Sequence, residues 1–81
     1  MKDYQNLVIK FITENGWVKD RELDNYQTYI KKNIIIGIDV DCEDIFLWNE
    51  DKYNYFNLDE NGFYSLLEYL IQNRLILNRG K

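Results

Sequence analysis

The carboxylates of this chain are the side chains whose spacing suggests metal binding or catalysis. Asp39, Asp41 and Glu43 alternate along the chain, and Glu50 follows them. Counted from Asp39, these side chains occupy positions one, three, five and twelve of an EF-hand loop, whose oxygen ligands surround Ca²⁺. Position six is Asp44, however, where the sharp turn of that loop needs glycine, and we expect strands on both sides where the motif has helices. We therefore predict no metal site and no cofactor.

Side chains that could catalyse a reaction are scarce. The chain has no histidine, and neither its one serine nor its two threonines stand in a recognisable nucleophile motif. Paired carboxylates can perform acid–base chemistry where different environments separate their pKa values, but this acidic stretch has the pattern of a solvated row. Cys42 is in phase with the apolar residues before it, which predicts a buried, unreactive thiol. We predict that the protein is not an enzyme.

The acidic residues directly follow the most apolar stretch of the chain. Over residues 34–42 the even positions are apolar, while the odd positions change from apolar to acidic at Asp39 and Asp41 and continue to Glu43. This period of two predicts a strand with one buried face and one solvated face. Alternate residues of a strand lie about 6.6 Å apart, a spacing comparable with that of neighbouring phosphates on a nucleic-acid strand. The row could therefore mimic nucleic acid; the alternative is that exposed acids only promote solubility.

The distribution of charge along the chain is more informative than the net charge of −4. Residues 39–60 hold eight acids and one base, whereas residues 1–38 carry a balance of +1 and residues 61–81 a balance of +2. An acidic surface repels nucleic acid and attracts basic partners. We predict a protein partner with a basic surface and no direct nucleic-acid binding.

Two stretches have the periodicity of amphipathic helices, with apolar residues at i, i+3, i+4, i+7 and i+8. The first covers residues 3–14 and ends at Asn15-Gly16. The second begins after Asp59, which is well placed as an N-cap, and residues 75–77 either extend it or add an edge segment before a frayed tail over residues 78–81. The apolar stripes are Tyr4, Leu7, Val8, Phe11 and Ile12 in the first helix, and Phe63, Leu66, Leu67, Leu70 and Ile71 in the second.

The residues between these helices predict a small sheet. Residues 26–31 and the isoleucine run form a hairpin, residues 45–48 a buried strand and residues 53–58 an alternating strand, whereas residues 17–25 are charged and poorly periodic and predict a loop. The result is one domain over residues 1–81, of α+β class, with a small antiparallel sheet of three to four strands packed against an N-terminal and a C-terminal helix, αβ(3–4)α. The alternative is a helix over residues 19–32, which would suggest a winged-helix regulator, although acids are interspersed among its bases.

The chain has thirteen aromatic residues among its 81. Five of them lie off the apolar stripes, and such residues beside asparagines are typical of recognition surfaces. Tyrosine also packs well on half-buried sheet faces, so both interpretations stay open. The five residues are Trp17, Tyr53, Tyr55, Tyr64 and Tyr69.

Composition places limits on the compartment. A single cysteine permits no intrachain disulfide, which indicates a reducing compartment. The first residues lack the apolar region of a signal peptide, and no apolar run approaches the roughly 20 residues of a membrane span. We therefore expect a soluble, cytoplasmic protein. Many Asn, Ile, Lys and Tyr, few Arg and no Ala or Pro indicate AT-rich codons, and hence a low-GC bacterium or its phage.

Two helices, a small antiparallel sheet and acids gathered on one side resemble the layout of small phage-encoded inhibitors such as anti-CRISPR and other DNA-mimic proteins. We therefore expect a non-enzymatic domain that occupies a basic surface of a larger partner. The alternative is a homodimer that pairs through a sheet edge at residues 26–31 or 53–58. The predicted partner-binding residues are Asp39, Asp41, Glu43, Glu50, Asp51, Tyr53 and Tyr55.

Overall fold

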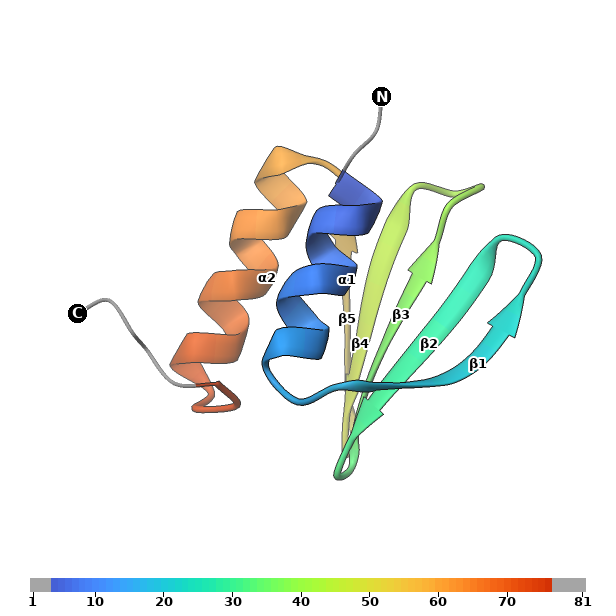
Figure 1. The fold of residues 1–81 in the computed structure, drawn as a ribbon. Coiled ribbons are helices and arrows are strands. Elements are labelled where there is room, and N and C mark those ends of the chain that lie inside the picture. Colours follow the sequence, from blue (N-terminus) through green and yellow to red (C-terminus); the bar gives the residue numbers. More distant parts are fainter. Residues whose placement is uncertain (1–3, 77–81) are drawn as a thin grey trace.

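A computed structural model describes residues 4–76 of the chain. Each strand pairs antiparallel with the next one along the chain, so the sheet order is β1-β2-β3-β4-β5 (Figure 1). The predicted α+β class is confirmed, with one helix before the sheet and one after it, whereas the predicted count of three to four strands is wrong. The elements are α1 (Tyr4–Glu14), β1 (Val18–Leu23), β2 (Tyr26–Lys31), β3 (Ile34–Asp39), β4 (Asp44–Asn49), β5 (Lys52–Asn57) and α2 (Glu60–Gln72).

The additional strand is β1, which replaces the loop predicted over residues 17–25. All six of its residues are exposed, so no alternation of apolar and polar residues marks it. A bulge at Asp20, between the pairs Lys19–Tyr29 and Arg21–Thr28, breaks the period further. Pairing with β2 is what makes this segment a strand. The alternative helix over residues 19–32 is wrong, and residues 26–31 form an inner strand instead of an edge.

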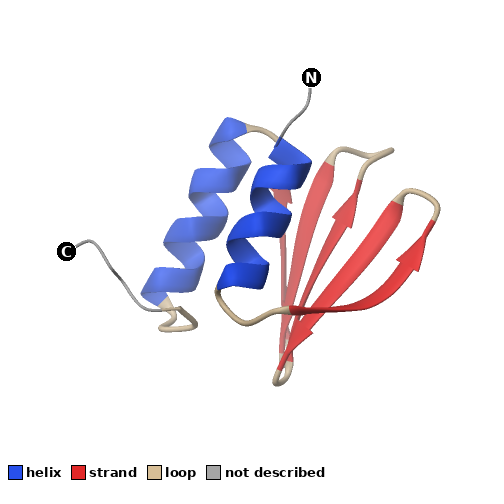
Figure 2. Ribbon diagram, in the orientation of Figure 1, coloured by secondary structure: helices blue, strands red, loops and turns tan. Residues whose placement is uncertain are grey.

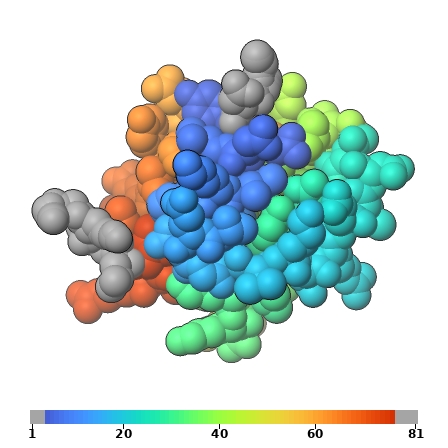
Figure 3. All heavy atoms as spheres, viewed as in Figure 1, coloured from blue at the N-terminus to red at the C-terminus, as the bar shows by residue number. Residues whose placement is uncertain are grey.

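Both helices lie on the same face of the sheet (Figure 2). In the space-filling view from that side, α1 covers the centre and the β1–β2 hairpin extends beyond the helices (Figure 3). The core between the two layers uses the predicted even positions of β3. Its most deeply buried aliphatic residues are Val8, Ile12, Ile36, Ile38, Ile45, Leu47, Leu66 and Leu70.

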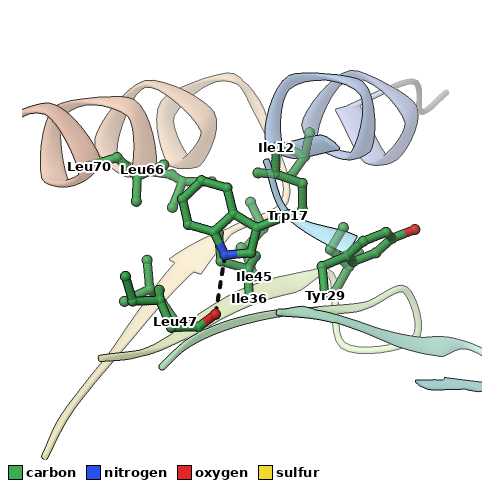
Figure 4. Packing of buried hydrophobic residues seen from close by; sticks show 11 residues of the cluster. Ile12, Trp17, Tyr29, Ile36, Ile45, Leu47, Leu66 and Leu70 are labelled. Atoms are coloured by element: carbon green, nitrogen blue, oxygen red, sulfur yellow. Dashed lines mark hydrogen bonds between the residues drawn. The ribbon is translucent and has the colours of Figure 1, made fainter. Parts of the chain in front are cut away.

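Trp17 belongs to this core and not to a recognition surface. Its indole is 2% exposed and lies among the aliphatic side chains (Figure 4). The indole Nε1 donates to the carbonyl oxygen of Ile34 at 3.2 Å, which satisfies the one polar atom of the ring. Lys31 Nζ lies 4.6 Å from the ring centroid and donates to the carbonyl oxygen of Asn15 at 2.7 Å. Trp17 therefore ties the end of α1 to the start of β3.

The end of α1 and the start of α2 lie close to their predicted positions. Gly16 follows α1 with φ +106°, a left-handed conformation that ends the helix without steric cost. The Asp59 carboxylate accepts from the Gly62 backbone N–H at 2.8 Å, which confirms this residue as the N-cap of α2. In the first apolar stripe, Leu7 is 44% exposed, so its predicted place in the core is wrong.

After α2 the chain turns back toward the core. The Leu75 backbone N–H donates to the carbonyl oxygen of Leu70 at 2.8 Å, and both Leu75 and Ile76 pack against the core cluster. Neither a helix extension nor an edge strand forms at these two residues. The predictions for Leu77 and for the tail over residues 78–81 lie outside the described residues.

The first turn of α2 packs on the backbone at the end of β5. A Cβ atom at Gly62 would overlap the Asn57 carbonyl group, which is backbone and cannot move aside. We expect Gly62→Ala to lower the free energy of unfolding by about 2–3 kcal/mol through overpacking, since the gain in helix propensity is only about 1 kcal/mol. Denaturant unfolding measures this change. The exposed Ser65→Ala in the same helix should stay within about 0.5 kcal/mol, and a Gly62→Ala protein as stable as the wild type would contradict the packing.

Candidate binding surface

The face of the sheet opposite the helices is uncovered in the described chain, and we call it the open face. Residues paired directly across strands share a face, so the strand register arranges its side chains in three rows. The first row is Leu23, Tyr26, Asp39, Asp44 and Asn57. The middle row is Arg21, Thr28, Gly37, Phe46 and Tyr55. The last row is Val18, Ile30, Ile35, Trp48 and Tyr53.

Five rings on this face contact one another, and we call them the aromatic cluster. The Tyr26 and Phe46 rings are stacked, with centroids 5.5 Å apart and an interplanar angle of 21°. The Tyr53 ring joins them to the rest, with centroids 5.8 Å from Phe46, 5.3 Å from Trp48 and 4.9 Å from Tyr55. The cluster therefore runs from β2 across to β5.

Gly37 lets the centre of this face pack closely. A Cβ atom at this position would overlap the ring of Phe46, so the absence of a side chain gives the ring a place against β3. Phe46 is only 6% exposed although neither α1 nor α2 covers it. Thr28, on the other side of Gly37, is 7% exposed, and its Oγ1 has no hydrogen-bond partner among the described residues. The open face thus has a small packed centre of its own.

Around that centre the side chains are exposed. Trp48, Tyr53 and Tyr55 are 49%, 46% and 61% exposed. Val18 and Leu23 at the two ends of β1 are also exposed, so five of the seven large exposed apolar side chains in the described chain lie on this face. The exposed Trp48, Tyr53 and Tyr55 rings are in contact through Tyr53, and contiguous exposed rings are typical of binding surfaces.

Tyr53 and Tyr55 were predicted from the sequence to bind a partner, whereas Tyr26, Phe46 and Trp48 were not. Residues 45–48 are all apolar, which gave no means of assigning one face to the core and the other to solvent. Strand pairing is the feature that could have identified these three residues as neighbours on one face. A strand that is apolar on both faces, next to the alternating Tyr53 and Tyr55, implies a second apolar face on the sheet.

Acidic residues gather at one end of the sheet, and we call Asp24, Asp39, Asp41, Glu43 and Asp44 the acidic end. They lie in or beside the β1–β2 and β3–β4 turns, and neither turn contains a lysine or arginine. Asp59 and Glu60 follow the end of β5 on the same side. A shallow hollow of about 820 Å³ opens here, lined by Glu22, Leu23, Asp24, Asn25, Tyr26, Asp39 and Asp41.

The predicted row of carboxylates along one strand is wrong, because β3 ends at Asp39. Asp41 and Glu43 lie in the turn that follows, and Glu43 has a left-handed φ of 57°. The turn is held by hydrogen bonds in which the Cys42 backbone N–H donates to Asp39 Oδ1 at 3.1 Å and Asn25 Nδ2 donates to Asp41 Oδ2 at 2.9 Å. Acidic charge is therefore concentrated but not evenly spaced.

The seven predicted partner-binding residues are not all brought together. Asp39, Asp41 and Glu43 belong to the acidic end, whereas Glu50 and Asp51 lie in or beside the β4–β5 turn at the opposite end of the sheet. Strands of this length separate the two ends by about 17 Å. Tyr53 and Tyr55 lie on the open face between them.

Cys42 is exposed in the β3–β4 turn, so its predicted burial is wrong. Its chain position was in phase with β3, but the strand ends before it. Neighbouring carboxylates, Asp39 first, raise the pKa of the thiol, which disfavours the reactive thiolate.

The stretch that matched an EF-hand loop is a strand end, a turn and a strand. The helices that flank a calcium loop of that type are absent from this part of the structure. Over residues 4–76, no group of three or more His, Cys, Asp or Glu side chains is placed to hold a metal ion.

Comparisons with protein-family models, with curated proteins and with solved structures find no match for this chain. None of the helices within residues 4–76 combines the length and the apolar composition required to cross a membrane.

The pKa values of Tyr53 and Tyr26 in the cluster are raised above the ordinary value for tyrosine. The hydroxyls of Tyr53 and Tyr55 share a hydrogen bond of 3.1 Å, which together with partial burial raises the pKa of Tyr53 to about 12. Burial, and then the charges of Asp39 and Tyr55, raise the pKa of Tyr26.

We expect Tyr55→Phe to lower the pKa of Tyr53 from about 12 toward its ordinary value of 10.0, because the hydrogen bond is the largest cause of the shift. A raised folded-state pKa contributes stability that is complete below pH 10 and is lost as the pH rises toward 12. The stability of the variant should therefore depend less on pH in that range. NMR titration of ring-labelled tyrosine measures the pKa of Tyr53 in the wild type and in the variant. Tyr64→Phe on α2 is the control, and an unchanged Tyr53 titration in Tyr55→Phe would contradict the bond.

Proposed function

We propose that this chain is a non-enzymatic, cytoplasmic protein-binding domain that docks its open face and acidic end on a basic surface of a larger protein. One observation carries the proposal: an exposed aromatic cluster lies directly beside a concentration of carboxylates on the uncovered side of the sheet. Exposed aromatic side chains supply contact area at low entropic cost. Carboxylates at the border select the sign of the partner and steer its approach.

The same face argues for a protein partner over a nucleic acid. Aromatic sheet faces can stack bases, but such sites combine the rings with a positively charged groove. Here Arg21 is the only basic residue that the register places on the open face in the described chain. The bordering acids would repel phosphate groups.

Such a domain would inhibit a nucleic-acid-binding protein if the basic surface it occupies is that protein's nucleic-acid site. The chain would then act in the same way as the phage-encoded inhibitors and DNA mimics that it resembles in layout and charge. Mimicry would depend on the density of acidic charge at one end, since the evenly spaced row is absent.

A second candidate function is self-association through β5. This edge strand has a regular register with β4 and one charged residue, Lys52, whereas β1 at the other edge has a bulge and four charged residues. Bulges and charges protect edges from pairing, so β5 is the edge open to a second copy. Light scattering distinguishes the two functions, because a mass of one chain at every concentration contradicts self-association.

The main proposal predicts an association rate that depends on the acidic end. We expect the triple substitution Asp39→Asn, Asp41→Asn, Glu43→Gln to slow association with a basic partner captured from a low-GC bacterial lysate by about tenfold or more at low salt, and much less at high salt. Surface plasmon resonance measures the rate.

The matched control removes three carboxylates away from this end, with Glu14→Gln, Asp20→Asn and Glu68→Gln. It changes the net charge equally and should alter the rate little. Equal rates for the wild type and the triple variant of the acidic end, at low salt, would contradict the proposed function.

A further inference from the structure

Within the first row, two carboxylates lie directly opposite each other. Asp39 and Asp44 pair across β3 and β4, an arrangement in which like charges destabilise the sheet. One oxygen of Asp39 accepts from the Cys42 backbone N–H. The one ion pair within residues 4–76 joins Lys19 to Glu22 elsewhere. The paired carboxylates therefore form a strong acceptor site for a cation that the described chain does not supply.

One ring lies beside this carboxylate pair in the first row, and a second lies diagonally from it in the middle row. Tyr26 is directly opposite Asp39 on β2, and Tyr55 lies on β5, next to the position opposite Asp44. Stacked Phe46 supports Tyr26 from the middle row. A planar cation with several N–H donors is the group that this combination suits best.

The open face also contains a hydroxyl without a partner. Thr28 follows Tyr26 by two positions on β2 and lies on the same face. Its Oγ1 is buried and unpaired within the described chain, a state that typically costs about 1–3 kcal/mol. Because Oγ1 itself is buried, a donor from a partner reaches it only if the side chains that cover it move.

The size and charge of the face distinguish between two possible occupants. Five strands spaced about 4.8 Å apart and about 17 Å long give the sheet face a projected area of roughly 300 Å², which is small beside the roughly 800 Å² of accessible surface that each partner buries in a standard interface. A second copy would also bring a second net charge of −4. A single segment of a basic protein fits both limits, because it needs a smaller area and carries the opposite charge.

We propose that the first row of the open face binds an arginine side chain from such a segment, with the guanidinium on Asp39 and Asp44 and its plane against Tyr26 or Tyr55. This inference rests on the proposed function and names the group that the partner contributes. Arginine is favoured over lysine because its flat, forked guanidinium stacks on rings and bridges two carboxylates.

The test uses the full chain with acetylated, amidated tetra-arginine and tetra-lysine peptides as probes. NMR titration at low salt gives both the affinity and the residues affected. We expect the largest shifts at Tyr26, Asp39, Asp44 and Tyr55, and severalfold tighter binding of tetra-arginine than of tetra-lysine. Asp39→Asn with Asp44→Asn should weaken tetra-arginine binding by about tenfold, whereas Glu50→Gln with Asp51→Asn, which removes the same charge from the opposite end, should weaken it less than threefold.

Asparagine at position 39 still offers an acceptor to the Cys42 N–H, and thermal unfolding followed by circular dichroism checks that the double variant is folded. If it is not, the single variants Tyr26→Leu and Tyr55→Leu provide the second test, and loss of the stacking ring in one of them should remove the preference for arginine. Equal losses in the two double variants, or equal binding of both peptides, would overturn the arginine site while leaving a basic partner in place. Failure of both peptides to bind the wild type would overturn the proposed function as well.

Discussion

Two helices cover one face of a five-stranded sheet, and the rest of the structure depends on this constraint. The apolar stripes of α1 and α2 meet the even-numbered isoleucines of β3 and their neighbours on β4, and Trp17 closes the layer between them. The helix side therefore has the single core that an 81-residue chain can build. Within residues 4–76 no second layer covers the other face, which must therefore be stable without one.

The open face achieves this through contacts among its own side chains. Phe46 lies against Gly37 and is buried there, and Tyr26 and Tyr53 pack on its two sides. Cross-strand aromatic pairs contribute about 0.2–1 kcal/mol each, so the cluster helps to hold the sheet register. The outer rings of the same cluster remain exposed, and one set of residues thus serves stability at the centre and presents a contact surface at the border.

Sequence patterns identified the elements whose residues report directly on burial. The period of α1 and α2, the cap at Asp59 and the alternation in β3 each follow from local chemistry, and the structure confirms them. β1 escaped prediction because its residues are all exposed and a bulge breaks their period. It forms through pairing with β2, an interaction between segments that local propensity does not encode.

Only part of the candidate surface could be predicted from the sequence. Composition identified the acidic stretch and the tyrosines of β5, but extending the period of β3 past Asp39 placed Cys42 in the core and Asp41 and Glu43 on a strand. The β3–β4 turn begins immediately after Asp39, and only the strand register brings Tyr26, Phe46 and Trp48 to one face. Tertiary pairing, and not residue type, decides which aromatic side chains meet.

The two tryptophans of the chain report on whether the aromatic face of the sheet is open to solvent. Trp17 is 2% exposed in the core, whereas Trp48 is 49% exposed on the open face. Acrylamide quenching of tryptophan fluorescence, compared between the wild type and Trp48→Phe, separates their contributions. We predict one readily quenched and one protected component in the wild type, and the protected component alone in Trp48→Phe. If the wild type were as strongly protected from acrylamide as Trp48→Phe, this face would be covered and not open to solvent.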